Sequence, residues 1–314
     1  MKNLILTGFF LSSLALPVMA QEPVYKTFPA TVAQPSQSSL QEKTALVEAK
    51  EAFEKHPNSS ETRATYARQL LKEENYKEAL THYLWCYDNA TAYEPDYEAV
   101  RISFLIAHIS DFGGKYKPAI DALAERRDKA QENLLNNQAS DSEQLRGVIL
   151  MNRALNNGAE KNLALFDALK KDKRTNLVGL MANYLQEDLL AAKRYSDIIE
   201  NAGDISKKLA LRMAASQTFI HTRVNAENNQ PKKLMVAPFE FLKTGTINYA
   251  GQYFTALLGV NDIDQARKIA QQIIDFDPTP QTFALLIRKA HEFDAKDLTK
   301  DLAEQAKEVL IEKN

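Results

Sequence analysis

Apolar residues recur at intervals of three and four along most of the chain from Leu40 onward, the spacing of one face of an α-helix. In TALVEAKEAFEKHP, for example, Leu46, Ala49 and Phe53 share a face, and Pro57 ends the helix. Glycine is scarce, with 10 residues, and nothing in this part of the chain indicates a β-sheet. The pattern predicts an all-α fold.

A short motif recurs at the start of several predicted helices. It has an aromatic residue or Ile, two further positions and then Ala or Ile, as in NYKEAL, KYKPAI, RYSDII and DIDQAR. The anchor residues are Tyr76, Tyr116, Tyr195 and Ile263, separated by 40, 79 and 68 residues. The last two spacings are close to double a single unit, so each gap is expected to hold one degenerate unit. The expected additional turns lie near Gly158, near Asn228–Pro231 and near Asp294–Lys296.

The stretch TYARQLLKEENYKEALTHYLWCYDNATAYEP resembles a tetratricopeptide (TPR) repeat, a helix–turn–helix unit of roughly 34 residues. The matching positions are Ala67, Tyr76, Ala79 and Tyr83, with Pro95 a few residues late. RISFLIAHISDFGGKYKPAIDALAERR is similar through Gly114, Tyr116 and Ala119, and INYAGQYFTALLGVNDIDQARKIAQQIIDFDP through Ala266, Ala270 and Pro278. The segment 194–199 matches in part, and the remaining units match only by their period. The phrase YLWCYDNA is also similar to uncharacterised exported bacterial proteins of this superfamily.

This resemblance implies the architecture of the main part of the chain. Residues 39–314 are expected to form one TPR-like domain, a right-handed α-solenoid of about fifteen helices arranged as antiparallel pairs. Each pair would bury one face only against its neighbours, so stacking supplies the core.

The N-terminus predicts export. Lys2 precedes an apolar run from Leu4 to Leu16, and the small residues Val18 and Ala20 favour cleavage before Gln21. Residues 1–20 are therefore predicted to be a signal peptide, with an uncleaved N-terminal anchor as the alternative. No Cys directly follows the cleavage site to carry a lipid, so the location is expected to be periplasmic or secreted, without an integral membrane segment.

Residues 21–38 contain three Pro and no apolar period, and are expected to be a flexible leader or a short recognition segment.

Charge and cysteine content narrow the possible functions. Without residues 1–20 the chain has 38 basic and 41 acidic residues, a balance that argues against a nucleic-acid partner. The single cysteine, Cys86, cannot form an internal disulfide, although an oxidising compartment would permit one.

His82 and Cys86 lie four residues apart, so they share one helix face and could form a thiol–imidazole pair, with Asp88 nearby. A nucleophile and base one turn apart cannot readily converge on a substrate, and Cys86 falls where the resemblance places a small packing residue. Buried packing is therefore the preferred interpretation, because free Cys behaves as a small hydrophobe.

The five histidines are scattered, no HExxH motif occurs and there is no second Cys, so no metal site and no cofactor are expected. The basic run ALKKDKRTN, residues 168–176, is expected to be a solvated turn.

The expected function is that of a binding scaffold, not an enzyme. In the family register, the first helix of each pair lines the concave surface, on which a protein or peptide partner would bind. The residues expected there are Arg68, Lys72, Arg101, Phe104, His108 and Asp111. The alternatives are a thiol-dependent enzyme that uses Cys86 and His82, and a rigid subunit of an envelope assembly complex. The partner's identity and the oligomeric state do not follow from the sequence.

Overall fold

The computed structural model describes residues 38–136, 142–226 and 236–311. The predicted signal peptide, nearly all of the predicted leader and the turn expected near Asn228–Pro231 lie outside these residues. The described residues form helices and turns without a β-strand, so the all-α prediction is confirmed for this part of the chain. No helix among them is long and apolar enough to cross a membrane.

The helices follow one another with short connections. They are α1 (Ser38–Lys55), α2 (Ser60–Lys72), α3 (Tyr76–Tyr93), η1 (Pro95–Tyr97), α4 (Glu98–Val100), η2 (Arg101–Leu105), α5 (Ile106–Gly113), α6 (Lys117–Asn136), α7 (Ser142–Ala154), α8 (Gly158–Lys171), α9 (Thr175–Tyr184), α10 (Gln186–Ala191), α11 (Tyr195–Glu200), α12 (Ile205–Ala226), α13 (Val236–Gly259), α14 (Ile263–Phe276), α15 (Pro280–Glu292) and α16 (Lys296–Ile311). Here α4, the π-helical η2 and α5 are continuous, which makes fifteen α-helical units in the described residues.

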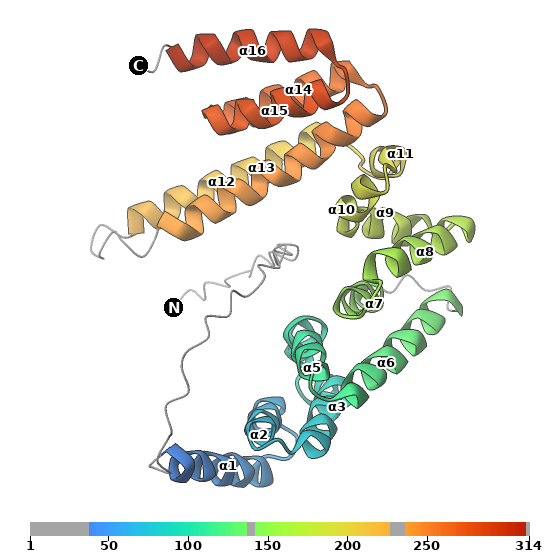
Figure 1. Cartoon of the computed structure of the whole chain (residues 1–314), viewed down its shortest axis with the longest axis vertical. Helices are drawn as coiled ribbons and strands as arrows, with labels where there is room; N and C mark the ends of the chain where they lie inside the picture. Colours follow the sequence, from blue (N-terminus) through green and yellow to red (C-terminus); the bar gives the residue numbers. More distant parts are fainter. Residues whose placement is uncertain (1–37, 137–141, 227–235, 312–314) are drawn as a thin grey trace, which may run out of the picture.

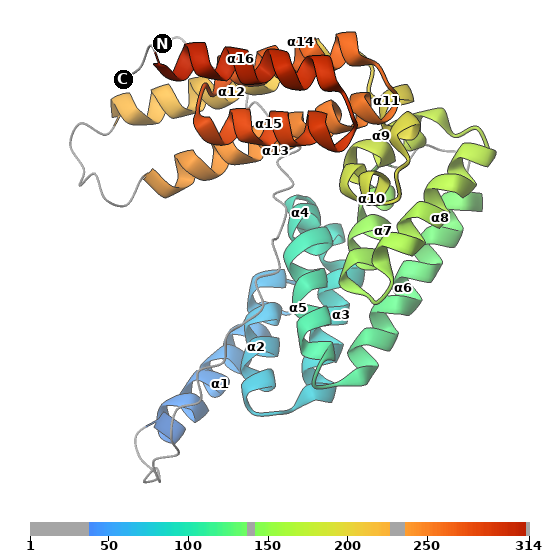
Figure 2. The same cartoon turned by 45° about the horizontal axis from the view of Figure 1, so that its top comes forward.

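Neighbouring helices in the chain are mostly neighbours in space. Most helices pack on the next one, and several also contact the next but one, as α5 does with α7 and α13 does with α15. The path is curved, so that α1–α6 and α12–α16 lie at opposite ends, with α7–α11 between them (Figures 1 and 2). The buried apolar residues accordingly form successive clusters along the path, not one central core.

Five of the turns between helices share one backbone conformation. In each, a residue in the left-handed region donates its N–H to the carbonyl three residues earlier, and the following N–H donates to the carbonyl five residues earlier. These two bonds define the Schellman motif, which satisfies the free carbonyls at a helix end. The left-handed residues are Glu74, Lys173, Lys193, Asn261 and Asp294.

These turns explain the self-similarity of the sequence. A new helix begins two residues after each left-handed residue, at Tyr76, Thr175, Tyr195, Ile263 and Lys296. Three of the four motif anchors are therefore first residues of helices. The turns predicted near Asp294–Lys296, near Gly158 and within residues 168–176 are confirmed.

The remaining anchor, Tyr116, follows a different turn. Gly114 has a right-handed backbone, and α6 begins one residue after Tyr116, at Lys117. Gly113 permits the tight connection, because a Cβ there would overlap the Ile120 side chain unless that side chain shifted.

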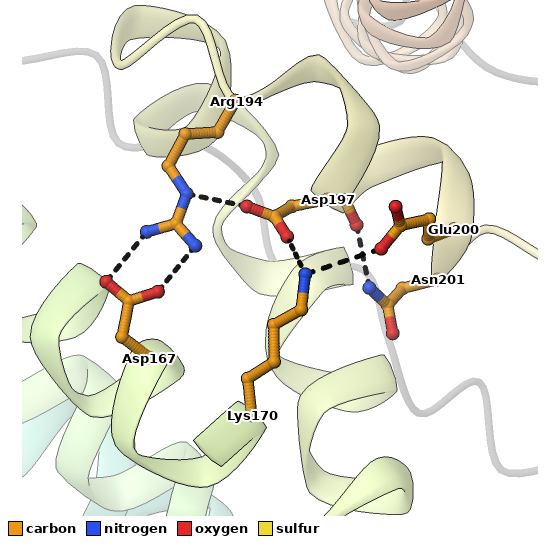
Figure 3. A network of polar contacts seen from close by, with 6 residues as sticks. All are labelled: Asp167, Lys170, Arg194, Asp197, Glu200 and Asn201. Carbon is orange, nitrogen blue, oxygen red and sulfur yellow. Dashed lines mark hydrogen bonds and ion pairs between the residues drawn. The ribbon is translucent and has the colours of Figure 1, made fainter. Parts of the chain in front are cut away.

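Charged side chains join α8 to α11 across the middle of the molecule. Arg194 donates to both oxygens of Asp167, at 2.6 and 3.0 Å, and its Nε donates to Asp197 at 2.6 Å (Figure 3). Lys170 donates to the other oxygen of Asp197, also at 2.6 Å, so this buried carboxylate has two cationic partners.

Candidate functional site

A groove of about 320 Å³ lies between α2 and the α4–α5 helix. Its residues come from α2, α3, η1 and the α4–α5 helix, so segments up to 48 residues apart in the chain meet there. They are Ser60, Glu61, Ala64, Arg68, Tyr83, Tyr97, Val100, Phe104, Leu105 and His108.

One face of α2 forms the first wall. Ser60, Ala64 and Arg68 are spaced by four residues and therefore lie along the same side of the helix. Tyr66, Ala67 and Leu70 of the same helix are buried in the protein core. The amphipathic pattern of α2 thus leaves a row of small and polar residues facing the groove.

The π-helical segment η2, Arg101–Leu105, shapes the second wall. A π-helix has a wider turn than an α-helix and often occurs at functional sites, because it changes the direction of the side chains. Ile102 and Leu105 are buried, whereas Phe104 is 69% exposed and Val100, one turn earlier, is 37% exposed. Two large apolar side chains therefore line the groove in contact with solvent.

Tyr83 of α3 lies at the base of the groove. The residue is only 2% exposed, and its hydroxyl group has no hydrogen-bond partner in the described part of the chain. Burial raises the pKa of Tyr83 to about 12, so the hydroxyl keeps its proton at neutral pH. A buried donor without an acceptor is energetically costly, and an oxygen atom of a bound partner would relieve that cost.

The rim of the groove is charged and polar. Arg68 is exposed, and its guanidinium donates to Thr65 Oγ1 at 2.9 Å. His108 is also exposed and stacks on the Tyr83 ring, with centroids 6.4 Å apart. The groove therefore offers apolar surface on one wall, a donor at its base and a cation at its edge.

Three of the six residues expected on the concave face line this groove, namely Arg68, Phe104 and His108. Arg101 does not, because both oxygens of Glu98 accept hydrogen bonds from it, at 2.7 and 2.6 Å, and its guanidinium stacks over Tyr87. Lys72 and Asp111 are exposed near the C-terminal ends of their helices and are not part of the lining.

Several lining residues were missed by the sequence analysis. The spacing of four that runs back from Arg68 points to Ala64 and Ser60, so these two could have been found. Tyr83 and Tyr97 could not, since they come from a helix and a turn whose approach to α5 depends on tertiary packing.

Cys86 is fully buried, and its Sγ lies 3.8 Å from the Ser60 carbonyl oxygen. Burial raises the pKa of the thiol to about 12, although Arg63 acts in the opposite direction. The prediction that Cys86 packs as a small buried residue is confirmed.

His82 has its own set of neighbours. Its ring lies edge-on to Phe53 and Tyr66, with centroids 4.8 and 5.0 Å apart, and its Nδ1 lies 3.4 Å from Arg63. Burial and the Arg63 charge lower the pKa of His82. No group of His, Cys, Asp and Glu suited to a metal ion occurs among the described residues.

No protein-family model matches the chain, and no curated protein matches it either.

Proposed function

We propose that this protein is an exported TPR-like scaffold that binds a protein or peptide partner in the groove between α2 and the α4–α5 helix and performs no catalysis. The observation that carries the proposal is the combination of an exposed Phe104 with the buried, unpartnered hydroxyl of Tyr83. An apolar side chain of the partner would pack on Phe104, and a carbonyl or carboxylate oxygen would accept the Tyr83 hydrogen bond. Arg68 favours an acidic residue beside this contact.

The arrangement of the helices supports the scaffold class. Successive helices that pack mainly on their neighbours, joined by a recurrent turn, are what a right-handed TPR-like solenoid requires. In such a fold the first helix of each pair lines the concave surface, and α2 and α5 both contribute to the groove. The predicted signal peptide supports export to the periplasm or beyond.

The proposal is tested by in vivo cross-linking of the tagged full chain, followed by capture and mass spectrometry. Phe104→Ser and Arg68→Glu are expected to reduce the yield of the partner by about ten-fold or more, the loss typical of a central contact residue. Lys72→Glu is the matched control, because it makes the same charge change on the same helix outside the groove. Equal capture by all three variants would exclude this groove as the binding site.

A second variant separates binding from folding. Tyr83→Phe removes only the hydroxyl, and is expected to stabilise the free protein by about 1 kcal/mol because a buried unsatisfied donor is lost. The same change is expected to weaken partner binding about five-fold, through the loss of one hydrogen bond. A loss of both stability and capture would instead show that the hydroxyl has a structural role.

A further inference from the structure

Two basic residues of α12 lie over two tyrosines of α13. Lys208 and Arg212 are four residues apart and share one face of α12, and Tyr249 and Tyr253 have the same spacing on α13. The Arg212 guanidinium carbon is 4.3 Å from the Tyr249 ring centroid, and Lys208 Nζ is 5.6 Å from that of Tyr253. The four side chains therefore form one cluster at the α12–α13 interface.

Neither cation has a carboxylate partner in the described part of the chain. Lys208 Nζ donates to Asn183 Oδ1 at 3.2 Å and to the Tyr253 hydroxyl oxygen at 3.3 Å, both of which are uncharged. Among the described residues the Arg212 guanidinium has no hydrogen-bond acceptor, and its Nε is shielded from solvent.

Several other partly buried cations of this protein have an acidic partner, whereas Arg63 lies over Phe53 and Trp85 and donates to the Pro57 carbonyl. Arg101, Arg126 and Lys243 each form an ion pair with a carboxylate, at 2.5–2.6 Å. By contrast, burial lowers the pKa of Lys208 and of Arg212, and no carboxylate among the described residues offsets this effect. Two positive charges drawn partly out of water without a counterion cost free energy, which a bound anion would recover.

We propose that Lys208, Arg212 and Tyr249 bind the phosphate group of a phosphate monoester at the junction of α12 and α13 with α9. Residues one helical turn apart have their Cβ atoms roughly 6 Å from one another, so both cations can contact the oxygens of one tetrahedral group. The exposed Asn183 at the edge of the cluster leaves a route for the ligand from solvent. The Tyr249 hydroxyl, 3.3 Å from that of Tyr253, supplies a further donor.

The number of charges selects the ligand class. A phosphate monoester carries a charge of about −1.5 to −2 at neutral pH and so matches two cations, whereas a carboxylate would leave one of them uncompensated. Phosphate also accepts two parallel hydrogen bonds from a guanidinium, which a planar arginine provides better than lysine.

Titration calorimetry of the full chain with inorganic phosphate tests the proposal, with chloride used to match the ionic strength. Arg212→Met and Lys208→Met are each expected to weaken phosphate binding by about ten-fold or more, since each removes a charge-assisted contact. Tyr249→Phe is expected to cause a smaller loss. Lys207→Met is the control, because Lys207 is an exposed lysine on the same helix.

The thermal midpoint of each variant in chloride shows whether it is folded. Arg212→Met and Lys208→Met are expected to unfold at a higher temperature than the original chain, because each removes an uncompensated charge. An absence of phosphate binding, equal binding by all variants, or acetate binding as tight as phosphate would each overturn the proposal.

Vesicle flotation distinguishes the two sources of the phosphate group. Binding to phosphatidic acid vesicles but not to phosphatidylcholine vesicles, with loss in Arg212→Met, would assign a lipid headgroup to the site. Binding of inorganic phosphate without vesicle binding would assign a soluble phosphate ester.

Discussion

Cys86 and His82 lie on the same helix, yet their side chains have different neighbours. The thiol lies against the backbone of Ser60, whereas the imidazole packs between Phe53 and Tyr66 and next to Arg63. A reactive thiolate requires a lowered pKa and access to solvent. In this protein, burial has the opposite effect on Cys86, so the residue spacing alone was not a sign of nucleophilic chemistry.

The buried state of Cys86 leads to a prediction about its reactivity. With the thiol pKa raised to about 12, a thiol reagent at about pH 8 is expected to label the native protein at least 100-fold more slowly than the denatured chain. Absorbance at the wavelength of the released thiolate, with and without guanidinium chloride, measures both rates. Rapid labelling of the native protein would contradict the buried arrangement.

The helices depend on turns whose backbone conformation does not suit the residues that occupy them. Glu74, Lys173 and Lys193 have φ values of 58, 57 and 56°, a region that costs residues with a Cβ about 1–2 kcal/mol. The hydrogen bonds of the Schellman motif compensate for this cost, because they satisfy carbonyls that the helix end leaves free. The motif therefore recurs even though its sequence lacks the usual glycine.

This conformation predicts a stabilising substitution. Lys193→Gly is expected to raise the free energy of unfolding by about 0.5–1 kcal/mol, because glycine adopts the left-handed conformation without strain. Chemical denaturation measures the change. The matched control is Lys129→Gly in the middle of α6, where the same substitution is expected to destabilise by about 1 kcal/mol. Equal losses at both positions would show that the turn is not strained.

On the scale of the whole molecule, stability depends on contacts between helices that lie near one another along the path, instead of one central core. The α8–α11 network of Figure 3 joins two helices that are not consecutive, and in it Asp197, which is 8% exposed, is held by Arg194 and Lys170. Burial by itself would raise the pKa of Asp197, but the hydrogen bonds from Lys170 and Arg194 outweigh it and lower the pKa. The charged form is thus favoured in the folded state.

This lowered pKa predicts a pH dependence. The contribution of Asp197 to stability is fully present above its unfolded pKa of 3.8, and is lost as the pH falls through the lower pKa of the folded state. Asp197→Asn is expected to reduce the free energy of unfolding by about 1–3 kcal/mol at neutral pH. The difference from the original chain should shrink as the pH falls below about 4, the usual range for an aspartate.

Urea denaturation at several pH values measures this difference. Asp167→Asn, in the exposed arm of the same network, is the control and is expected to cost less than about 1 kcal/mol. A difference for Asp197→Asn that does not change with pH would contradict the charged pair.

The sequence by itself determined the helices, most of their turns and the burial of Cys86. Helical hydrogen bonds and the pattern of apolar residues are local, so both can be found within a short window of the chain. The basic run at residues 168–176 indicated the turn before α9, but the sequence did not reveal that this turn has the same backbone conformation as the others, because Thr175 lacks the aromatic residue or Ile of the motif.

Tertiary structure decided which side chains come together in the two candidate sites, although three residues of the groove were expected from the sequence. The groove requires Tyr83 and Phe104 to meet across different helices, and the proposed phosphate site requires Arg212 to lie over Tyr249 without a carboxylate partner among the described residues. An arginine can line a groove, as Arg68 does, or pair with a neighbouring Glu, as Arg101 does. The direction in which the helix presents the side chain decides between the two. That direction is set by how each helix packs on the others, because residues far apart in the chain determine the burial and the charge around each side chain.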